Sequence, residues 1–148
     1  MTKRVEKAVE KFSKGFNCSQ SVFSAFAPPL GILERHALRI AAGFGGGMGR
    51  LQEVCGAVTG AFMVIGARNG NTEAADTVRK GKTYEEVRAF EKRFRKLHGT
   101  ILCRELLGLD LNTDEGQKQF KEKNLSGTVC SECVRDAAKI LDETVFEK

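Results

Sequence analysis

Apolar residues recur every three or four positions along most of the chain, which is the spacing of one face of an α-helix. The first half predicts helices over Lys3 to Lys14, from Asn17 to the Pro28-Pro29 pair, and over Leu33 to Ala42. Asn17 and Gln20 form a capping box, the usual start of a helix. No run of alternating Val, Ile, Thr and aromatic residues lies between turn residues, so no sheet is expected.

A further helix is predicted from Glu53 to Ala67, where the sequence is apolar on nearly every side. This pattern indicates a helix in the middle of the fold, and the segment is too short to cross a bilayer. Gly56 and Gly60 lie four positions apart, which allows a neighbouring helix to approach closely, at some loss of helix propensity. A glycine-rich loop, Gly43 to Arg50, precedes this central helix.

Threonines mark the predicted helix starts in the second half. Thr83 forms a capping box with Glu86, Thr100 precedes a short helix that ends at Gly108, and Thr128 precedes the final helix. Residues 110 to 124 are polar and predict a loop followed by a peripheral helix. The predicted inward-facing residues are Val87, Phe90, Phe94 and Leu97, then Cys103, then Cys130, Cys133 or Val134, Ala137 and Leu141.

These patterns predict an all-α, single-domain bundle of about six or seven helices over residues 1 to 148. A chain of 148 residues with 41% hydrophobic residues can form one core without disulfides. No stretch approaches the roughly 20 apolar residues of a membrane span. Residues 1 to 12 alternate charged and apolar side chains, unlike a signal peptide. We therefore expect a cytoplasmic protein without membrane insertion.

The five cysteines are the main candidates for chemistry. Cytosolic cysteines are more often metal-binding or catalytic than disulfide-bonded, and an odd number argues against a disulfide scaffold. Four of them fall in a predicted first helical turn, where free N–H groups favour the thiolate. Each also lies on an apolar stripe, so the four are predicted to converge, although a buried free Cys is often only a small core residue. They are Cys18, Cys55, Cys103 and Cys130.

The segment Cys55-Gly56-Ala57-Val58-Thr59-Gly60 resembles the Cys-Gly-Ala-x-x-Gly signature of the C_GCAxxG_C_C family of redox-active proteins. The resemblance covers the chain from about Lys11 to Leu141. It implies that Cys18, Cys55, Cys103 and Cys130 are the redox-active cysteines, whereas Cys133 is an addition to the family pattern. Similar blocks are Asn17-Cys18-Ser19-Gln20, Gly43 to Arg50, Cys103 to Gly108, and Cys130 before Val134-Arg135-Asp136-Ala137-Ala138.

Three chemistries are typical of cysteines grouped in this way. Four thiolates are the usual ligands of an iron–sulfur cluster or a structural zinc, which makes a metal centre in electron transfer or sensing the favoured interpretation. Thiol–disulfide exchange is the alternative, and Cys130-Ser131-Glu132-Cys133 has the Cys-x-x-Cys spacing for it. Covalent haem is excluded because Val134, not His, follows the second Cys.

The glycine-rich segment has two interpretations. Gly45, Gly46, Gly47 and Gly49 allow the backbone to approach a cofactor closely and donate N–H groups to it. The alternative is a flexible connector between two helices. The segment fits neither Gly-x-Gly-x-x-Gly nor a phosphate loop, so no nucleotide cofactor is expected.

The net charge of +5 is modest, but Arg79 to Lys96 contains eight basic and three acidic residues. A non-catalytic, helical partner-binding module that uses this stretch is a further alternative. Distant cysteines, together with exposed apolar residues on the basic face, would support it. With no Trp and one Tyr, nothing supports base stacking, so nucleic acid is not an expected partner. We expect a redox partner, and the sequence is compatible with a homodimer.

Overall fold

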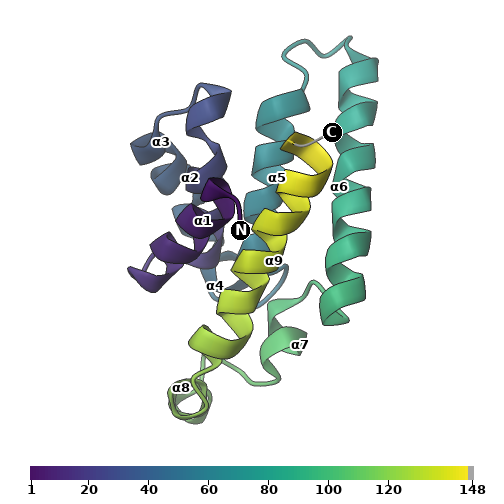
Figure 1. Cartoon of the computed structure of the whole chain (residues 1–148). Helices are drawn as coiled ribbons and strands as arrows, with labels where there is room; N and C mark the ends of the chain where they lie inside the picture. The colour runs from purple at the N-terminus through teal and green to yellow at the C-terminus, as the bar shows by residue number, and fades with distance from the viewer. Residues whose placement is uncertain (147–148) are drawn as a thin grey trace.

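The computed structural model describes residues 1–146, and helices account for nearly all of its regular structure (Figure 1). No β-strand occurs in this part of the chain, which confirms the all-α prediction. Eight α-helices of five residues or more are present where six or seven were predicted. They are α1 Lys3–Ser13, α2 Cys18–Phe26, α3 Glu34–Ala41, α5 Gly56–Asn69, α6 Thr77–His98, α7 Cys103–Leu107, α8 Asp114–Glu122 and α9 Ser131–Leu141.

Short helical turns join or extend these elements. Two are 3₁₀ turns, η1 Pro28–Leu30 and η2 Ala42–Phe44, and two are π-type turns, η3 Ser126–Cys130 and η4 Asp142–Phe146. The segment labelled α4, Gly45–Met48, is not a regular helix because two of its glycines have left-handed dihedral angles. No helix among residues 1–146 has the length and apolar character that a bilayer crossing requires.

The beginning of α2 follows the predicted capping box. The Asn17 side chain accepts a hydrogen bond from the Gln20 N–H at 2.9 Å, and the Gln20 side chain accepts one from the Asn17 N–H at 3.1 Å. Two of the free donors at the helix start are thereby satisfied. The helix ends at Phe26, just before the Pro28-Pro29 pair, as predicted.

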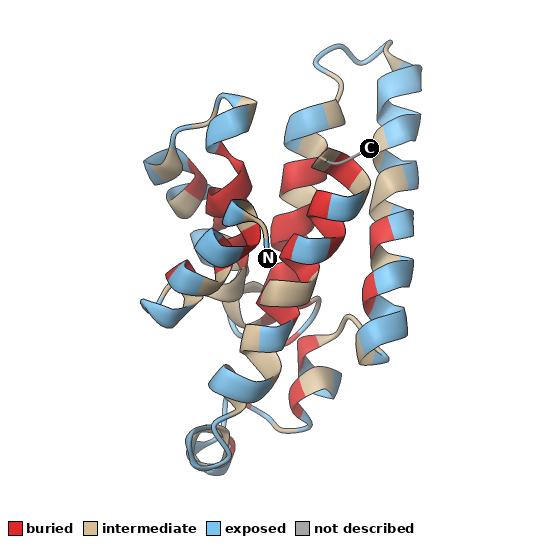
Figure 2. Cartoon of the chain, viewed as in Figure 1, coloured by how far each residue is buried: buried red, intermediate tan, exposed pale blue. Residues whose placement is uncertain are grey.

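The core is built around α5, which packs against α2, α6 and α9 (Figure 2). Its first residues, Gly56 to Ala61, are all buried, which confirms a central helix, although it begins at Gly56 and not at Glu53. A Cβ added at Gly60 would lie 2.9 Å from the Ser19 carbonyl oxygen of α2. The glycines therefore do allow a neighbouring helix to approach closely, and α2 is that helix.

Three predicted helix starts were wrong. Helix α6 begins at Thr77 with Asp76 as its cap, and Thr83 lies inside it, donating its hydroxyl to the Arg79 carbonyl. Gly81 does not end this helix, since a single glycine weakens a helix without breaking it. The cap residue of α7 is Leu102, and Thr100 accepts from the Leu102 N–H instead of capping the helix itself. Thr128 lies within η3, where the chain is already helical.

Leu97 was also predicted wrongly, since its exposure is 62%. Phe90 and Phe94 are buried as expected, and the next inward position, four residues on, is occupied by His98. The His98 ring stacks on Phe94 with ring centroids 4.5 Å apart and lies 2.9 Å from an Asp136 carboxylate oxygen. The apolar stripe of α6 therefore ends in a polar contact with α9.

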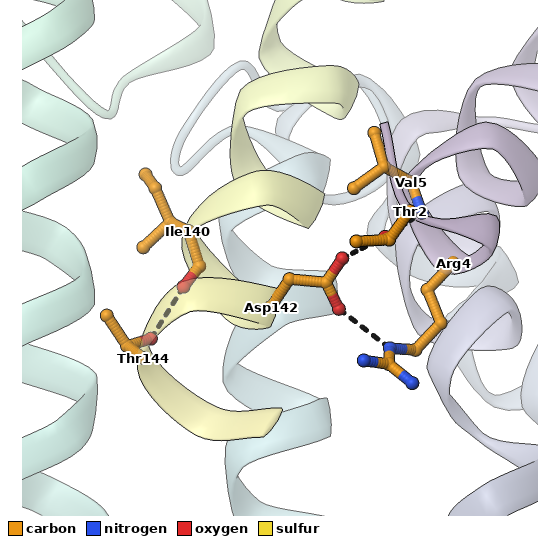
Figure 3. A network of polar contacts seen from close by, with 6 residues as sticks. All are labelled: Thr2, Arg4, Val5, Ile140, Asp142 and Thr144. Atoms are coloured by element: carbon orange, nitrogen blue, oxygen red, sulfur yellow. Dashed lines mark hydrogen bonds and ion pairs between the residues drawn. The ribbon is translucent and has the colours of Figure 1, made fainter. Parts of the chain in front are cut away.

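A polar network holds the N-terminal helix against the end of α9 (Figure 3). The Asp142 carboxylate, in a residue only 2% exposed, accepts from Arg4 Nε at 2.7 Å and from the Thr2 hydroxyl. Thr144 donates its hydroxyl to the Ile140 carbonyl at 2.6 Å. A buried carboxylate is destabilising unless it has hydrogen-bond partners. These contacts therefore favour the packing of two segments that are far apart in sequence.

The α2–α5 approach leads to a stability prediction. We expect Gly60→Ala to lower the free energy of unfolding by about 1–3 kcal/mol, because the new methyl group meets α2 backbone that cannot easily move. The matched control is Gly66→Ala in the same helix, where a Cβ has no neighbour within 4 Å. Alanine there should stabilise the helix by up to about 1 kcal/mol. Denaturant unfolding of both reduced variants measures the difference, and equal effects would contradict the prediction.

Candidate functional site

All five cysteines line one cavity of about 650 Å³. The cavity lies among the beginnings of α2, α5 and α7, the glycine-rich segment, and the junction of η3 with α9. The structure thus brings together the four cysteines that the sequence singled out, Cys18, Cys55, Cys103 and Cys130, and it adds Cys133 to them. In the described part of the chain all five are free thiols.

Cys18 and Cys55 are brought together by the contact between α2 and α5. Cys18 is the first residue of α2, and Cys55 directly precedes α5. A Cβ added at Gly56 would lie 3.0 Å from the Ser19 N atom and 3.2 Å from the Cys18 Cβ. The glycine that follows Cys55 therefore allows the two cysteine-bearing helix starts to meet.

Cys103 is placed by a short antiparallel bridge between Val54 and Leu102. The Cys55 N–H donates to the Ile101 carbonyl at 2.8 Å, and the Cys103 N–H donates to the Glu53 carbonyl at 2.7 Å. Cys55 and Cys103 thus each follow one half of the bridge and precede a helix. This pairing joins residues about fifty positions apart, so the local sequence pattern gave no sign of it.

The glycine-rich segment forms part of the cavity wall, and Gly45, Gly46, Gly47 and Gly49 all line the cavity. It is not a loose connector, because the Gln52 and Glu53 N–H groups donate to the Gly46 and Gly47 carbonyls. A Cβ added at Gly47 would lie 2.7 Å from the Cys103 Cβ. The run of left-handed residues here comprises Gly46, Gly47, Met48, Gly49 and Arg50, and Gln52 follows it.

Gln52 lies beside Gly47 of the cavity wall, and the sequence did not indicate its role. It is 4% exposed, its side-chain amide donates to the Leu109 carbonyl, and its side-chain oxygen accepts from the Leu111 N–H, both at 2.8 Å. A positive φ of 57° is unusual for a non-glycine residue, and these hydrogen bonds help to hold it. Gln52 thereby joins the glycine segment to the chain that follows α7. No sequence signal marked it, since a polar residue in a loop is ordinarily exposed.

Cys130 and Cys133 line the side of the cavity that η3 and α9 form. Cys130 ends η3 and directly precedes α9, so it does not lie at a free helix start as predicted. Cys133 lies in the first turn of α9 and is 1% exposed. Its spacing of three residues from Cys130 indicated that the two residues lie on the same side of a helix. Cys133 is nevertheless not one of the cysteines of the family pattern.

Contacts among the thiols divide them into proton donors and acceptors. The pKa of Cys55 is held well below its usual value by hydrogen bonds from Cys133 and Cys18, and then by the backbone N–H groups of Ala57 and Val58. A hydrogen bond with Cys18 likewise lowers the pKa of Cys130. The pKa of Cys18 is raised because this thiol donates to Cys130 and Cys55. Anionic sulfur is therefore favoured at Cys55 and Cys130.

The pKa values of Cys103 and Cys133 are raised, so these two thiols keep their protons more readily than Cys55 and Cys130. Burial raises the pKa of Cys103 to about 12, with a further contribution from the nearby Cys55 and Cys130. The pKa of Cys133 is raised by its hydrogen bond to Cys55 and by burial. The pKa of each of the five thiols thus depends on at least one other thiol of the same cavity.

Other side chains of the cavity are mainly apolar, with Phe16, Leu107 and Phe120 among them. Within residues 1–146, no group of three or more His, Cys, Asp or Glu side chains is arranged to hold a single metal ion. Helix α6 does carry exposed apolar residues, Val78 and Tyr84 as well as Leu97. The cysteines are not distant from one another, so only one of the two conditions for a partner-binding module is met.

Comparison with known families gave one match. The family described as "Putative redox-active protein (C_GCAxxG_C_C)" matches residues 16–144. This range contains all five cysteines and the whole cavity wall from Phe16 onward. No curated protein and no solved structure matches the chain.

Proposed function

Because this chain belongs to the C_GCAxxG_C_C family of redox-active proteins, we propose that its cysteines bind a metal centre, an iron–sulfur cluster, for electron transfer or sensing. The ligands are Cys18, Cys55, Cys103 and Cys130. One observation carries the proposal: four separate segments each contribute one of these cysteines to the lining of a single cavity. Four thiolates are the usual ligand set of such a cluster.

The cavity fits this group in three further ways. Its volume of about 650 Å³ leaves room for a centre larger than one ion. Gly45, Gly46, Gly47 and Gly49 line it, so backbone rather than side chains borders the space beside the thiols. Apolar residues such as Phe120 and Leu107 lower the local polarity. When bound, an iron–sulfur cluster supplies one-electron redox chemistry, and burial and nearby N–H donors tune its potential.

Thiol–disulfide exchange through the same cysteines is the second candidate. It is favoured by Cys55, which directly precedes α5 and whose pKa is held well below its usual value by hydrogen bonds from Cys133 and Cys18. A thiolate with a neighbouring thiol is the arrangement that exchange requires. The fold lacks thioredoxin-like strands in its described part, so this chemistry would take place on a different scaffold.

The deciding experiment is anaerobic purification followed by iron and sulfide reconstitution. We expect visible charge-transfer absorption, acid-labile sulfide and bound iron, because thiolate and sulfide donate strongly to iron. Colourless protein that contains close to one zinc per chain would indicate a structural or Lewis-acidic zinc site in place of the cluster. Metal-free protein with thiols that titrate reversibly against glutathione would favour exchange. Unreactive thiols without metal would contradict both candidates and leave core packing as the role of the cysteines.

A further inference from the structure

The cavity that the cysteines line has more space than a metal centre requires. An iron–sulfur cluster adds only a few atoms to the thiolates that bind it. The cavity volume of about 650 Å³ falls in the range of about 300–1,000 Å³ that is typical of pockets for whole small molecules. The cavity therefore has room for an organic ligand beside the thiols.

Apolar side chains from other segments complete the wall of the cavity. Phe16 lies between α1 and α2, Leu111 follows α7, and Phe120 lies on α8. Phe120 packs against an apolar cluster formed by Cys103, Leu107 and Leu111, so this wall is continuous with one of the cysteines. Such walls bind an apolar body because they remove its surface from water.

Among the described residues that line the cavity, Arg50 is the only one with a charged side chain, the thiols apart. It is exposed at the rim, and its Cγ lies 2.9 Å from where a Cβ at Gly46 would be, so it lies over the glycine wall. Within residues 1–146 no carboxylate forms an ion pair with Arg50, and Glu53, three positions on, pairs with Arg104. An arginine in this state is suited to the carboxylate of a ligand, which accepts two parallel N–H donors.

We propose that the cavity binds a small organic acid with an apolar body, beside the cysteines. The apolar body lies against Phe16 and Phe120, and the carboxylate pairs with Arg50 at the rim. That this acid is the substrate of the cysteine site rests on the proposed function, whereas its binding does not.

Two side chains of the cavity wall can be changed without disturbing the helical core. Phe120 lies on α8, at one end of the molecule (Figure 1), and within residues 1–146 this helix makes no extensive contact with another helix. The Gln117 side chain still ties α8 to the Leu111 carbonyl, at 2.6 Å. Arg50→Gln keeps a non-glycine residue at a φ of 65° and so adds no new backbone strain. Far-UV circular dichroism checks that Phe120→Ala and Arg50→Gln fold.

Calorimetric titration with 2-naphthoate measures binding, and 2-naphthol is the neutral probe with the same rings. The full-length reduced protein is titrated before and after iron and sulfide reconstitution. We expect one naphthoate per chain in both forms, bound about tenfold more tightly than naphthol, because Arg50 adds a charge-assisted hydrogen bond. Arg50→Gln should remove this preference and leave naphthol binding unchanged, whereas Phe120→Ala should weaken the binding of both probes.

Arg39→Gln is the matched control, since Arg39 is also exposed but does not line the cavity. Its affinity for both probes should equal that of the wild-type protein. Equal losses in Arg39→Gln and Arg50→Gln would show a general effect of net charge and overturn the proposal. Naphthol that binds as tightly as naphthoate, or naphthoate that does not bind, would also overturn it.

Iron analysis of the same samples separates this inference from the proposed function. If naphthoate binds as expected but the reduced protein never loads iron, the proposed function fails and the binding site stands. If iron loads but naphthoate binds neither form, the binding site alone is wrong. Expulsion of naphthoate by reconstitution would likewise contradict a ligand that binds beside the metal centre.

Discussion

Replacing Cys55 with serine is expected to reduce iron and acid-labile sulfide from near-stoichiometric amounts to the background of an unreconstituted sample. Cys55 lines the cavity directly before α5, and hydrogen bonds from Cys133 and Cys18 and from the first N–H groups of α5 hold its pKa well below the usual value. Serine keeps the size and a hydrogen-bonding group, but its oxygen is a much harder ligand than the thiolate that iron–sulfur clusters use. Metal analysis and the visible spectrum after anaerobic reconstitution measure the loss.

The matched control is Cys133→Ser, which removes a buried thiol from the same cavity wall. We expect this variant to retain most of its iron, because Cys133 is not one of the four proposed ligands. Cys130→Ser, only three positions away on the same wall, should lose it. Equal loss from Cys130→Ser and Cys133→Ser would indicate that the Cys-x-x-Cys pair is the working unit, and unchanged iron in Cys55→Ser would contradict the ligand assignment.

Gly47→Ala is expected to lower the free energy of unfolding by about 2–5 kcal/mol, the largest loss among single glycine substitutions at the site. Two causes add together at this position. Gly47 has a φ of 69°, which an alanine adopts only with strain, and its Cβ would lie 2.7 Å from both the Cys103 Cβ and the Gln52 Cα. Because the neighbours include backbone, the segment itself has to move.

Gly49→Ala is the control, since Gly49 has a similar φ of 60° but its Cβ would come no closer than 3.8 Å to any neighbour. It should therefore show the backbone strain alone, about 1–2 kcal/mol. Denaturant unfolding of the reduced proteins measures both variants, and reconstitution tests whether displacement of Cys103 also lowers iron loading. Equal losses of stability in the two variants would mean that the close approach to Cys103 contributes nothing.

Much of the fold was predictable from the sequence because its signals are local. Helical periodicity identified most of the helices, the capping box at Asn17 depends on residues three apart, and the Gly56 and Gly60 pair indicated a close helix contact. The predicted threonine caps were wrong because they, too, rested on local signals alone. Thr83 and Glu86 have the spacing of a capping box, but whether the helix starts there depends on whether the preceding turn is also helical.

The candidate site was predictable only in part. The sequence by itself determined that Cys18, Cys55 and Cys103 lie at or next to helix starts, since caps and turns set those positions. It did not determine the distances between them, because these depend on how helices from remote segments pack and on the bridge between Val54 and Leu102.

Only the tertiary structure decided which cysteines lie in the same cavity and how the wall of that cavity is shaped. It placed Cys133 in the same cavity as the four cysteines of the family pattern. It also held Gln52 in a left-handed conformation through hydrogen bonds to Leu109 and Leu111. Local propensity disfavours such a conformation for a non-glycine residue, and these contacts with residues remote in sequence help to stabilise it.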